Sequence, residues 1–483
     1  MKTVRESAFI AVVLCSLVSA FPALAGSGGA KTPSLEGVWL GTLKVPPNAE
    51  LRIVFNIRTN PDGSPAGTID SPDQGATGIA ISRIGIEKER VTIEVSVIGG
   101  RYEGTLNAGG SEISGQWMQG GVSLDLVMKR VKEAPKLQRP QEPKKPYPYL
   151  DEEVTYQNAK DGVTLAGTLT MPRTGSPFPA VLLITGSGPQ DRDETVFGHR
   201  PFLVLADYLT RRGVAVLRVD DRGAGGTKGD ASQATSEDFA RDVIAGIEYL
   251  KTRKEINRKR IGLIGHSEGG IIAPIVATQS SDVAFIVLMA GTGVTGDGIV
   301  EKQIANLLKT GGAGQAVVDA AIQSQRRVYE VVRNEKDPNL AKEKIREIIK
   351  ESASILTEQQ KQAMQHSAAA VDAQVRGAAS KWFRFFITYD PKTALRKVKC
   401  PVLAINGELD RQVPPKDNLP AIEQALREGG NTHFTVKELP GLNHLFQTAK
   451  TGNIDEYARI EETMSPVALE TIAKWIEGQM TQK

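Results

Sequence analysis

The sequence has few cysteines. Only two of its 483 residues are cysteine, and Cys15 lies in an N-terminal apolar stretch that we expect to be removed. Cys400 would then remain alone, so no intramolecular disulfide could form. Because Cys400 lies in an apolar run, we expect it to be a small buried hydrophobe and not a nucleophile. The absence of disulfides indicates a chain that is stabilised by a large core.

The sequence also lacks a large excess of charge of one sign. Lys and Arg number 59 against 56 Asp and Glu, and the basic excess is concentrated in residues 1–25 and 132–148. The remaining chain is close to neutral, whereas a nucleic-acid-binding domain would need a basic face, so we expect no nucleic-acid partner. An apolar content of 40% with mixed charge excludes wholesale disorder, collagen-like repetition and a polytopic membrane protein.

Long apolar runs are missing except at the N-terminus. Two basic residues precede an apolar stretch at 8–18, and the sequence ALA at 23–25 offers small residues for cleavage before Gly26. These features predict a signal peptide over 1–25 and a bacterial protein that is exported, either periplasmic or secreted. An uncleaved anchor is the alternative, but the run is short for a bilayer core of about 30 Å. No stable membrane span is expected after cleavage.

Residues 34–131 are rich in glycine and β-branched residues. Short alternations of apolar and polar residues at 51–57, 91–97 and 122–128, separated by turn sequences, predict an antiparallel meander or small barrel. The sequence GVW at 37–39 resembles the Gly-x-Trp start of lipocalin-like β-domains. A ligand-binding barrel is one interpretation of this β-rich accessory domain, and we favour the simpler one, a packing or dimerising sheet.

The rest of the chain differs in composition and in hydrophobic periodicity. Residues 132–149 carry five prolines among charged residues, which predicts a Pro-rich extended linker. Over 150–483 strands alternate with helices, which predicts an α/β domain with a mostly parallel sheet flanked by helices. Between about 293 and 393 the periodicity is purely helical, which predicts a helical cap. The expected strands lie at 163–170, 179–184, 214–219, 260–264, 283–289, 402–405 and 433–437, and the expected helices at 201–212, 236–253, 270–279 and 466–478.

A nucleophile motif lies in this second part. The sequence GHSEGG at 265–270 follows an apolar strand and precedes an apolar helix. This is G-x-S-x-G in the strand–turn–helix context of a nucleophile elbow, with glycines that permit a sharp and strained turn. We therefore expect Ser267 to be the nucleophile of a serine hydrolase.

A serine hydroxyl needs a base, and in this chain order the acid and the histidine follow the nucleophile. Asp410 lies in the loop after the strand expected at 402–405, at the position where the acid is expected, and Glu408 is the competing acid. His444 lies on the loop after the next strand and is our candidate for the general base. The other histidines are expected at a helix start (His199), in the elbow with a role in packing or in shaping the pocket (His266), in the cap (His366) and on a strand (His433).

An oxyanion hole needs two backbone N–H groups. One is expected from Glu268, the residue after the nucleophile, and the other from the glycine-rich loop at 185–194. Either Ser187 or Gly188 would supply that second donor, and the sequence leaves the choice open.

The expected cap contains a cluster of aromatic residues at 382–386. It suggests an apolar wall for an acyl group, with Phe385 and Phe386 as substrate-binding residues. Asp372 is the alternative feature, a carboxylate that would hold the amine of a peptide substrate.

As an ordered set these motifs resemble the α/β-hydrolase superfamily. Within it, they resemble bacterial exported carboxylesterases that join a lipocalin-like N-terminal domain to a serine-aminopeptidase-like hydrolase domain. The resemblance implies Ser267, Asp410 and His444 as a catalytic triad and hydrolysis of esters with short acyl chains. The matching stretches are 186–193, 221–223, 265–269, 407–410 and 440–444.

We therefore predict a serine carboxylesterase that acts on a small-molecule ester substrate. A peptidase, thioesterase or lactonase with the same triad is the alternative, and a non-catalytic ligand-binding protein is a third reading that the complete triad disfavours. No metal cluster, P-loop or dinucleotide fingerprint stands out, so no cofactor is predicted. The physiological substrate and the oligomeric state are left open, a dimer being one option.

Overall fold

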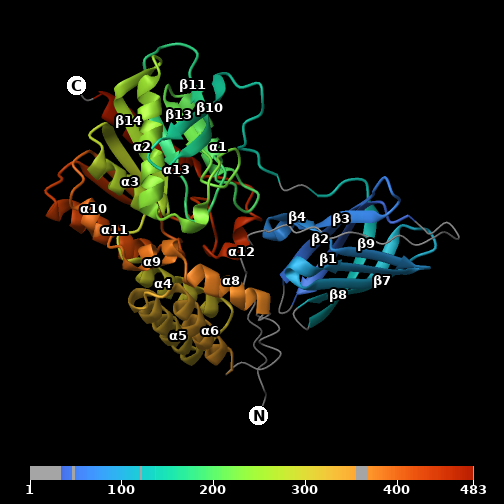
Figure 1. Cartoon of the computed structure of the whole chain (residues 1–483). Helices are drawn as coiled ribbons and strands as arrows, with labels where there is room; N and C mark the ends of the chain where they lie inside the picture. Colours follow the sequence, from blue (N-terminus) through green and yellow to red (C-terminus); the bar gives the residue numbers. More distant parts are fainter. Residues whose placement is uncertain (1–33, 46–48, 120–121, 136–137, 355–367, 482–483) are drawn as a thin grey trace. The chain divides into compact units, whose positions relative to one another are not determined.

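The computed structural model describes residues 34–481, apart from 46–48, 120–121, 136–137 and 355–367. The described chain divides into two compact units, and the second of them begins at Gln138. The expected signal peptide and His366 lie outside the described residues. Each unit is built around its own sheet (Figure 1).

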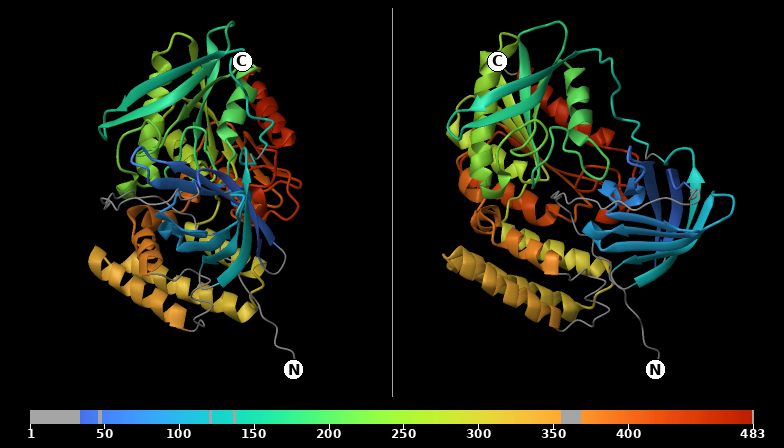
Figure 2. Two further views of the ribbon diagram at one scale, coloured as in Figure 1. Left: turned by 90° about the vertical axis from the view of Figure 1, so that its right-hand side faces the viewer. Right: turned by 45° about the vertical axis from the view of Figure 1, so that its right-hand side comes forward.

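Within the described residues, the first unit contains a nine-stranded antiparallel sheet in the order β4-β3-β2-β1-β9-β8-β7-β6-β5. The sheet curls upon itself (Figure 2). The alternations at 51–57, 91–97 and 122–128 correspond to β2, β6 and β9, with β6 ending two residues early in a short 3₁₀ turn. The strands are β1 (Gly37–Val45), β2 (Ala49–Thr59), β3 (Pro65–Ser71), β4 (Ala76–Ala80), β5 (Arg83–Glu87), β6 (Arg90–Val95), β7 (Gly100–Leu106), β8 (Glu112–Gln119) and β9 (Val122–Val131).

The inner face of this curled sheet is filled by large side chains. Trp39, Phe55, Tyr102 and Trp117 are buried in one apolar cluster. The Tyr102 hydroxyl donates a hydrogen bond to a backbone carbonyl of β8 at 2.9 Å, which satisfies its polar end inside the core. The predicted antiparallel sheet is confirmed, whereas the lipocalin-like character of the domain stays a prediction.

The second unit contains, among the residues described, an eight-stranded sheet in the order β10-β11-β13-β12-β14-β15-β16-β17. The β10–β11 and β11–β13 pairs are antiparallel and all later pairs are parallel. Its central strands are buried along most of their length because helices cover both faces. The strands are β10 (Leu150–Asn158), β11 (Val163–Met171), β12 (Phe178–Ile184), β13 (Ala215–Val219), β14 (Ile256–His266), β15 (Val283–Met289), β16 (Val402–Gly407) and β17 (Phe434–Leu439).

Alternate side chains of β12 show how the two faces are covered. Val181 and Leu183 belong to the core that the sheet shares with α1 (Pro201–Thr210) and α13 (Pro466–Thr481). Leu182 points the other way and contacts Gly246 of α2 (Ser236–Thr252). Helix α3 (Gly269–Gln279) packs against α2, and α11 (Pro415–Glu428) packs on β16 and β17 (Figure 1).

The helix starts are encoded locally. Thr235 and Asp238 form a capping box at the start of α2, in which the Thr235 N–H donates to the Asp238 carboxylate at 2.7 Å. Pro201 occupies the first turn of α1, where its missing N–H costs nothing. The parallel strands between the helices all end at the same edge of the sheet, so the loops that follow them meet there.

Outside residues 355–367, the chain between β15 and β16 is mostly helical, as the change in periodicity predicted. Helix α9 (Lys381–Thr388) contacts α2. The other helices described in this insertion are α4 (Gly296–Thr310), α5 (Gln315–Asn334), α6 (Pro338–Ser354), α8 (Ala368–Ala378) and α10 (Lys392–Leu395). The α/β-hydrolase fold with a helical insertion and a preceding antiparallel domain is thus confirmed.

The linker region 138–149 belongs to the second unit. The Arg139 guanidinium donates hydrogen bonds to the backbone carbonyls of Ala458 at 2.7 Å and Ile460 at 3.0 Å. The Gln141 side chain donates to the Met464 carbonyl at 2.7 Å. Most of the proline-rich segment is therefore part of the second unit.

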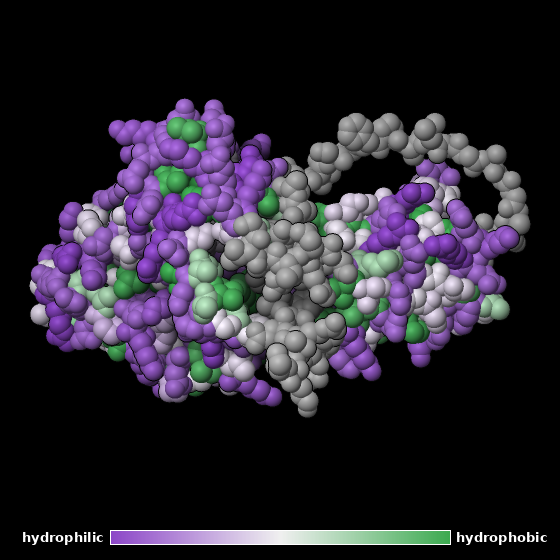
Figure 3. Space-filling model, turned by 90° about the horizontal axis from the view of Figure 1, so that it is seen from below, coloured by the Kyte–Doolittle hydropathy of each residue, from purple (hydrophilic) through white to green (hydrophobic). Residues whose placement is uncertain are grey.

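In the part of the chain that the structure describes, no helix is long and apolar enough to cross a bilayer. The face shown in Figure 3 is mostly hydrophilic, with small separate groups of hydrophobic residues.

Candidate active site

The predicted nucleophile lies on a strained turn between β14 and α3. Ser267 has a φ of +52°, which a non-glycine residue adopts only when the surrounding structure imposes it. Its N–H donates to the Met289 carbonyl of β15 at 2.8 Å. A Cβ at Gly265 would collide with the backbone of Gly269, and a Cβ at Gly269 would collide with the Ile184 carbonyl. The flanking glycines are therefore required by the sharpness of this turn.

The predicted acid and base are hydrogen-bonded to each other. His444 Nδ1 lies 2.7 Å from Asp410 Oδ2. The other oxygen of Asp410 accepts the N–H groups of Gln412 and Val413, both at 2.8 Å. Both side chains are buried, at 3% exposure for Asp410 and 5% for His444. The carboxylate is thus fixed by its own loop and orients the imidazole so that Nε2 is the nitrogen available for a reaction.

The competing candidates have other partners. The Glu408 carboxylate accepts the Gly441 N–H at 2.8 Å, so it supports the loop that leads to His444. His199 is buried against Thr463 and the Tyr457 carbonyl, and burial lowers its pKa to about 4. His433 is exposed just before β17. The positions of His199 and His433 are compatible with His444 as the candidate base.

The loop expected to carry the oxyanion donor passes beside the nucleophile. A Cβ added at Gly186 would lie 3.4 Å from the Cβ of Ser267. The Gly186 N–H already donates to the Glu194 carboxylate at 2.8 Å. Gly188 has a φ of +89°, a conformation that favours glycine. The N–H of Gly186 is therefore engaged in a hydrogen bond that holds the loop. The positive φ of Gly188 sets the backbone conformation next to Ser187.

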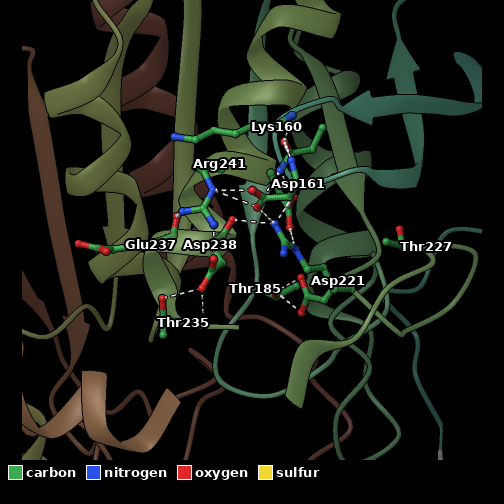
Figure 4. Close-up of polar contacts among 12 residues, drawn as sticks. Lys160, Asp161, Thr185, Asp221, Thr227, Thr235, Glu237, Asp238 and Arg241 are labelled. Carbon is green, nitrogen blue, oxygen red and sulfur yellow. Dashed lines mark hydrogen bonds and ion pairs between the residues drawn. The ribbon is translucent and has the colours of Figure 1, made fainter. Parts of the chain in front are cut away.

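A half-buried carboxylate, that of Asp221, holds the base of this loop. The Thr185 hydroxyl donates to Asp221 at 2.8 Å, as Figure 4 shows, and the Gln190 N–H donates to the same side chain at 3.0 Å. Burial raises the pKa of Asp221 to about 8, although these hydrogen bonds oppose the shift. A cavity of about 40 Å³ adjoins Thr185, Gly186 and Asp221, which is room for a few water molecules and not for a substrate.

The turn after β13, with the sequence DDRG at 220–223, pairs its charged side chains with residues of other segments. Asp220 pairs with Arg192, and Arg222 pairs with Asp161 and Asp242. Arg241 also binds Asp161, which joins α2 to the turn before β11 (Figure 4). The partners come from distant segments, so the sequence of the turn could not reveal them.

His266, which we expected to pack or to shape the pocket, is the centre of a polar network beside the nucleophile. Its Nδ1 lies 2.9 Å from Glu194 Oε1 and its Nε2 lies 3.0 Å from the His444 carbonyl oxygen. The His266 and His444 rings are 4.8 Å apart between centroids. The neighbour of Ser267 is therefore in contact with the loop that carries the base.

Helix α9 reaches the elbow through a residue that the sequence did not single out as a site residue. The Trp382 indole N–H donates to Glu268 Oε1 at 2.8 Å, and the Ser236 hydroxyl donates to the same oxygen at 2.6 Å. Glu268 is 2% exposed, and its burial raises the pKa of the carboxyl above its ordinary value while these bonds oppose the shift. Glu268, the residue after the predicted nucleophile, is thus hydrogen-bonded to the helical insertion.

The two predicted substrate residues have different surroundings. Phe386 is buried and stacks on Trp382, with ring centroids 5.1 Å apart and an interplanar angle of 8°. Phe385 stacks instead on Tyr389 at 4.9 Å. Asp372, the alternative cap residue, forms an ion pair with Arg346. The aromatic side that contacts the elbow is therefore that of Trp382 and Phe386.

In the described part of the chain, no group of three or more His, Cys, Asp or Glu side chains is arranged to hold a metal ion. Cys400 is a free cysteine that is half-buried, and burial raises the pKa of its thiol to about 11.

The sequence pattern of the X-Pro dipeptidyl-peptidase (S15) family matches residues 161–437, more than half of the chain, and includes the elbow and Asp410. The chain belongs to this family. The S15 family member has the α/β-hydrolase fold, and Ser267 lies on the turn at which that fold carries its nucleophile.

Two relatives of the S15 family member are named for an enzymatic activity. Esterase EstD of Thermotoga maritima is 25% identical over 313 residues, which are 65% of this chain and 65% of EstD. Dipeptidyl aminopeptidase BIII of Pseudoxanthomonas mexicana is 30% identical over 125 residues, which are 23% of this chain and 17% of that enzyme. The chain therefore spans less than two thirds of the length of each relative.

Among solved structures, the S15 family member is similar to the esterase PF2001 of Pyrococcus furiosus, with 16% identity and a TM-score of 0.42. The similarity covers 69% of this chain and 91% of that one.

Proposed function

We propose that this protein cleaves carboxylic esters with short acyl chains, using Ser267 as nucleophile, His444 as general base and Asp410 as the residue that orients it. The observation that carries the proposal is the 2.7 Å hydrogen bond between His444 Nδ1 and Asp410. The loops that carry these two residues leave the sheet at the same edge as the strained elbow of Ser267. The similarity to esterase EstD supports an ester as the substrate.

The reaction follows from these positions. Ser267 Oγ attacks the ester carbonyl carbon while His444 Nε2 takes the hydroxyl proton, and the Asp410 carboxylate stabilises the imidazolium. The Glu268 N–H, with the N–H of Ser187 or Gly188, would bind the oxyanion. Collapse expels the alcohol, which receives the proton from His444, and leaves an acyl-enzyme. Water, deprotonated by His444, then releases the carboxylic acid and restores the serine.

The preference for short acyl chains is inferred from the aromatic side chains of α9. Trp382 is fixed by its bond to Glu268 and is backed by Phe386, so these rings would close the acyl side of the site. Phe385, stacked on Tyr389 on another side of the helix, stays a candidate substrate residue that only the sequence cluster supports.

Replacement of the nucleophile tests the proposal. We expect wild-type protein to turn over a short p-nitrophenyl ester and Ser267→Ala to lose at least about 10⁴-fold in kcat, because the acyl-enzyme can no longer form. The exposed variant Ser232→Ala serves as a matched control and should keep wild-type activity. Retention of turnover by Ser267→Ala would contradict the assignment.

A second candidate function is cleavage of peptide amides next to a free N-terminus. The S15 family match and the similarity to dipeptidyl aminopeptidase BIII favour it. The cap carboxylate first considered for the substrate amine, Asp372, is instead paired with Arg346. A panel of acyl esters and aminoacyl amides decides between the two functions, and we expect higher kcat/KM for the acyl esters.

We also propose that the protein is exported after cleavage before Gly26. The basis is the sequence of residues 1–25, which lie outside the described residues. N-terminal sequencing of protein recovered from a periplasmic fraction should begin at Gly26, and recovery with Met1 from the cytoplasm would contradict export.

A further inference from the structure

Each ring nitrogen of His266 faces an oxygen that can accept a hydrogen bond. Nδ1 lies 2.9 Å from Glu194 Oε1, and Nε2 lies 3.0 Å from the carbonyl oxygen of His444. A neutral imidazole carries one ring proton, so it would leave a lone pair directed at one of these oxygens. An imidazolium carries two protons and satisfies both contacts.

The oxygen of Glu194 that faces His266 is itself in use as an acceptor. Glu194 Oε1 also accepts the Gly186 N–H at 2.8 Å. A proton on this oxygen would compete with the hydrogen bond from Gly186, which disfavours a protonated Glu194 as the donor to His266. The positive charge therefore belongs on the imidazole and the negative charge on the carboxylate.

We propose that His266 is held as an imidazolium in an internal ion pair with Glu194, and that this pair positions the oxyanion loop and the His444 loop on either side of Ser267. The inference rests on the proposed catalytic roles of Ser267 and His444. His266 and Glu194 are positioning residues in this account, because both ring nitrogens are engaged and neither side chain is assigned a contact with the substrate.

The pair connects three segments that are distant in sequence. Glu194 accepts the N–H of Gly186, and a Cβ added at Gly186 would lie 3.4 Å from the Cβ of Ser267. His266 precedes the nucleophile and binds the backbone carbonyl of His444. Glu194 has a φ of +53°, an unusual backbone conformation for glutamate that the surrounding contacts must stabilise. Loss of the charge on either partner would release both loops from the elbow.

The charged groups around the ring favour this assignment. Burial by itself lowers the pKa of His266, but the Glu194 carboxylate and the two hydrogen bonds outweigh burial and raise it above the ordinary value. Asp410, behind His444, acts in the same direction. The facing ring of His444 is 4.8 Å away between centroids, and Asp221 lies within electrostatic range of Glu194 on the side of the loop base.

The charge state can be read directly from ¹⁵N-histidine-labelled full-length protein. At about pH 8 an ordinary histidine is neutral. We expect one imidazolium signal with both ring nitrogens protonated at this pH, absent from the spectrum of His266→Gln and retained in that of the exposed control His433→Gln. The wild-type spectrum is decisive even if His266→Gln does not fold, because a spectrum with no imidazolium signal at pH 8 would overturn the proposal.

The positioning role is tested by Glu194→Gln, which keeps the size of the side chain and removes its charge. We expect the imidazolium signal at pH 8 to disappear and kcat for a short ester to fall by about tenfold to a hundredfold with a smaller change in KM. Unchanged kcat in a folded variant would overturn the positioning role. Failure of wild-type Ser267 to react with a fluorophosphonate would instead contradict the proposed function and leave the ion pair standing.

Discussion

At the scale of single residues, the two carboxylates of the loop after β16 have separate tasks. Asp410 is bonded to His444, whereas Glu408 accepts the Gly441 N–H. We predict that Asp410→Asn lowers kcat by about 10⁴-fold, because the amide no longer holds the imidazole in its reactive tautomer. Glu408→Gln keeps an acceptor for Gly441 and should lose less than about tenfold. Ester hydrolysis by the two folded variants checks this, and the opposite order would make Glu408 the acid.

Asp221 gives a pH dependence to stability. Its pKa is about 8 in the folded protein against an ordinary 3.8, so the folded state binds this proton more tightly than the unfolded chain. The stability associated with the proton is fully present below about pH 4 and is lost as the pH rises through about 8.

Comparison with an isosteric amide isolates that effect. We predict that the Tm of wild-type protein falls between pH 5 and pH 9 relative to that of Asp221→Asn, because the amide has no proton to lose. Thermal unfolding of both proteins across this range is the measurement. Parallel curves would show that Asp221 keeps the same charge in the folded and unfolded states.

The residues of the proposed triad could be predicted because each follows a strand in a fixed order along the chain. Ser267 was marked by the glycines that its turn requires, and His444 by elimination among five histidines. The contact between His266 and Glu194 joins residues 72 positions apart and has no local pattern. Such contacts depend on how the loops meet above the sheet, which periodicity does not encode.

At the scale of elements, helix α9 is linked to the elbow by one hydrogen bond, from Trp382 to Glu268. We predict that Trp382→Phe, which retains the ring against Phe386, lowers kcat/KM for a short ester by about tenfold, since a lost buried bond costs about 1–3 kcal/mol. Trp475→Phe makes the same substitution in α13, where Trp475 packs on Phe285, and should leave kcat/KM near wild type. Equal effects of both substitutions would indicate a general loss of stability.

The strands that the sequence missed or shortened share a physical reason. In β10 alternate residues are buried and the sequence carries three acidic residues, because the strand lies at the edge of the sheet. In β14 Arg258 and Lys259 are exposed, so the continuous apolar run of the strand begins only at Ile261. Buried central strands were predicted to within a few residues, since their apolar runs are continuous on both faces.

At the scale of the whole molecule, length and composition predicted more than one unit. They did not predict to which unit the residues of the linker belong. The prolines of 132–149 predicted an extended spacer, yet residues 138–149 belong to the second unit, where the side chains of Arg139 and Gln141 bind backbone carbonyls. Both side chains bind carbonyls that are more than 300 residues away in the sequence. Hydrophobic periodicity is a local pattern and does not predict such contacts.

The central claim is that Ser267 is the nucleophile of an acyl-transfer reaction in the full chain. Mass spectrometry of protein treated with a fluorophosphonate tests it most directly, with peptide mapping of the adduct and an ester assay on the same sample. We predict one adduct, on the peptide that contains Ser267, together with complete loss of ester hydrolysis. An adduct on another residue, or loss of hydrolysis without labelling of Ser267, would contradict the account.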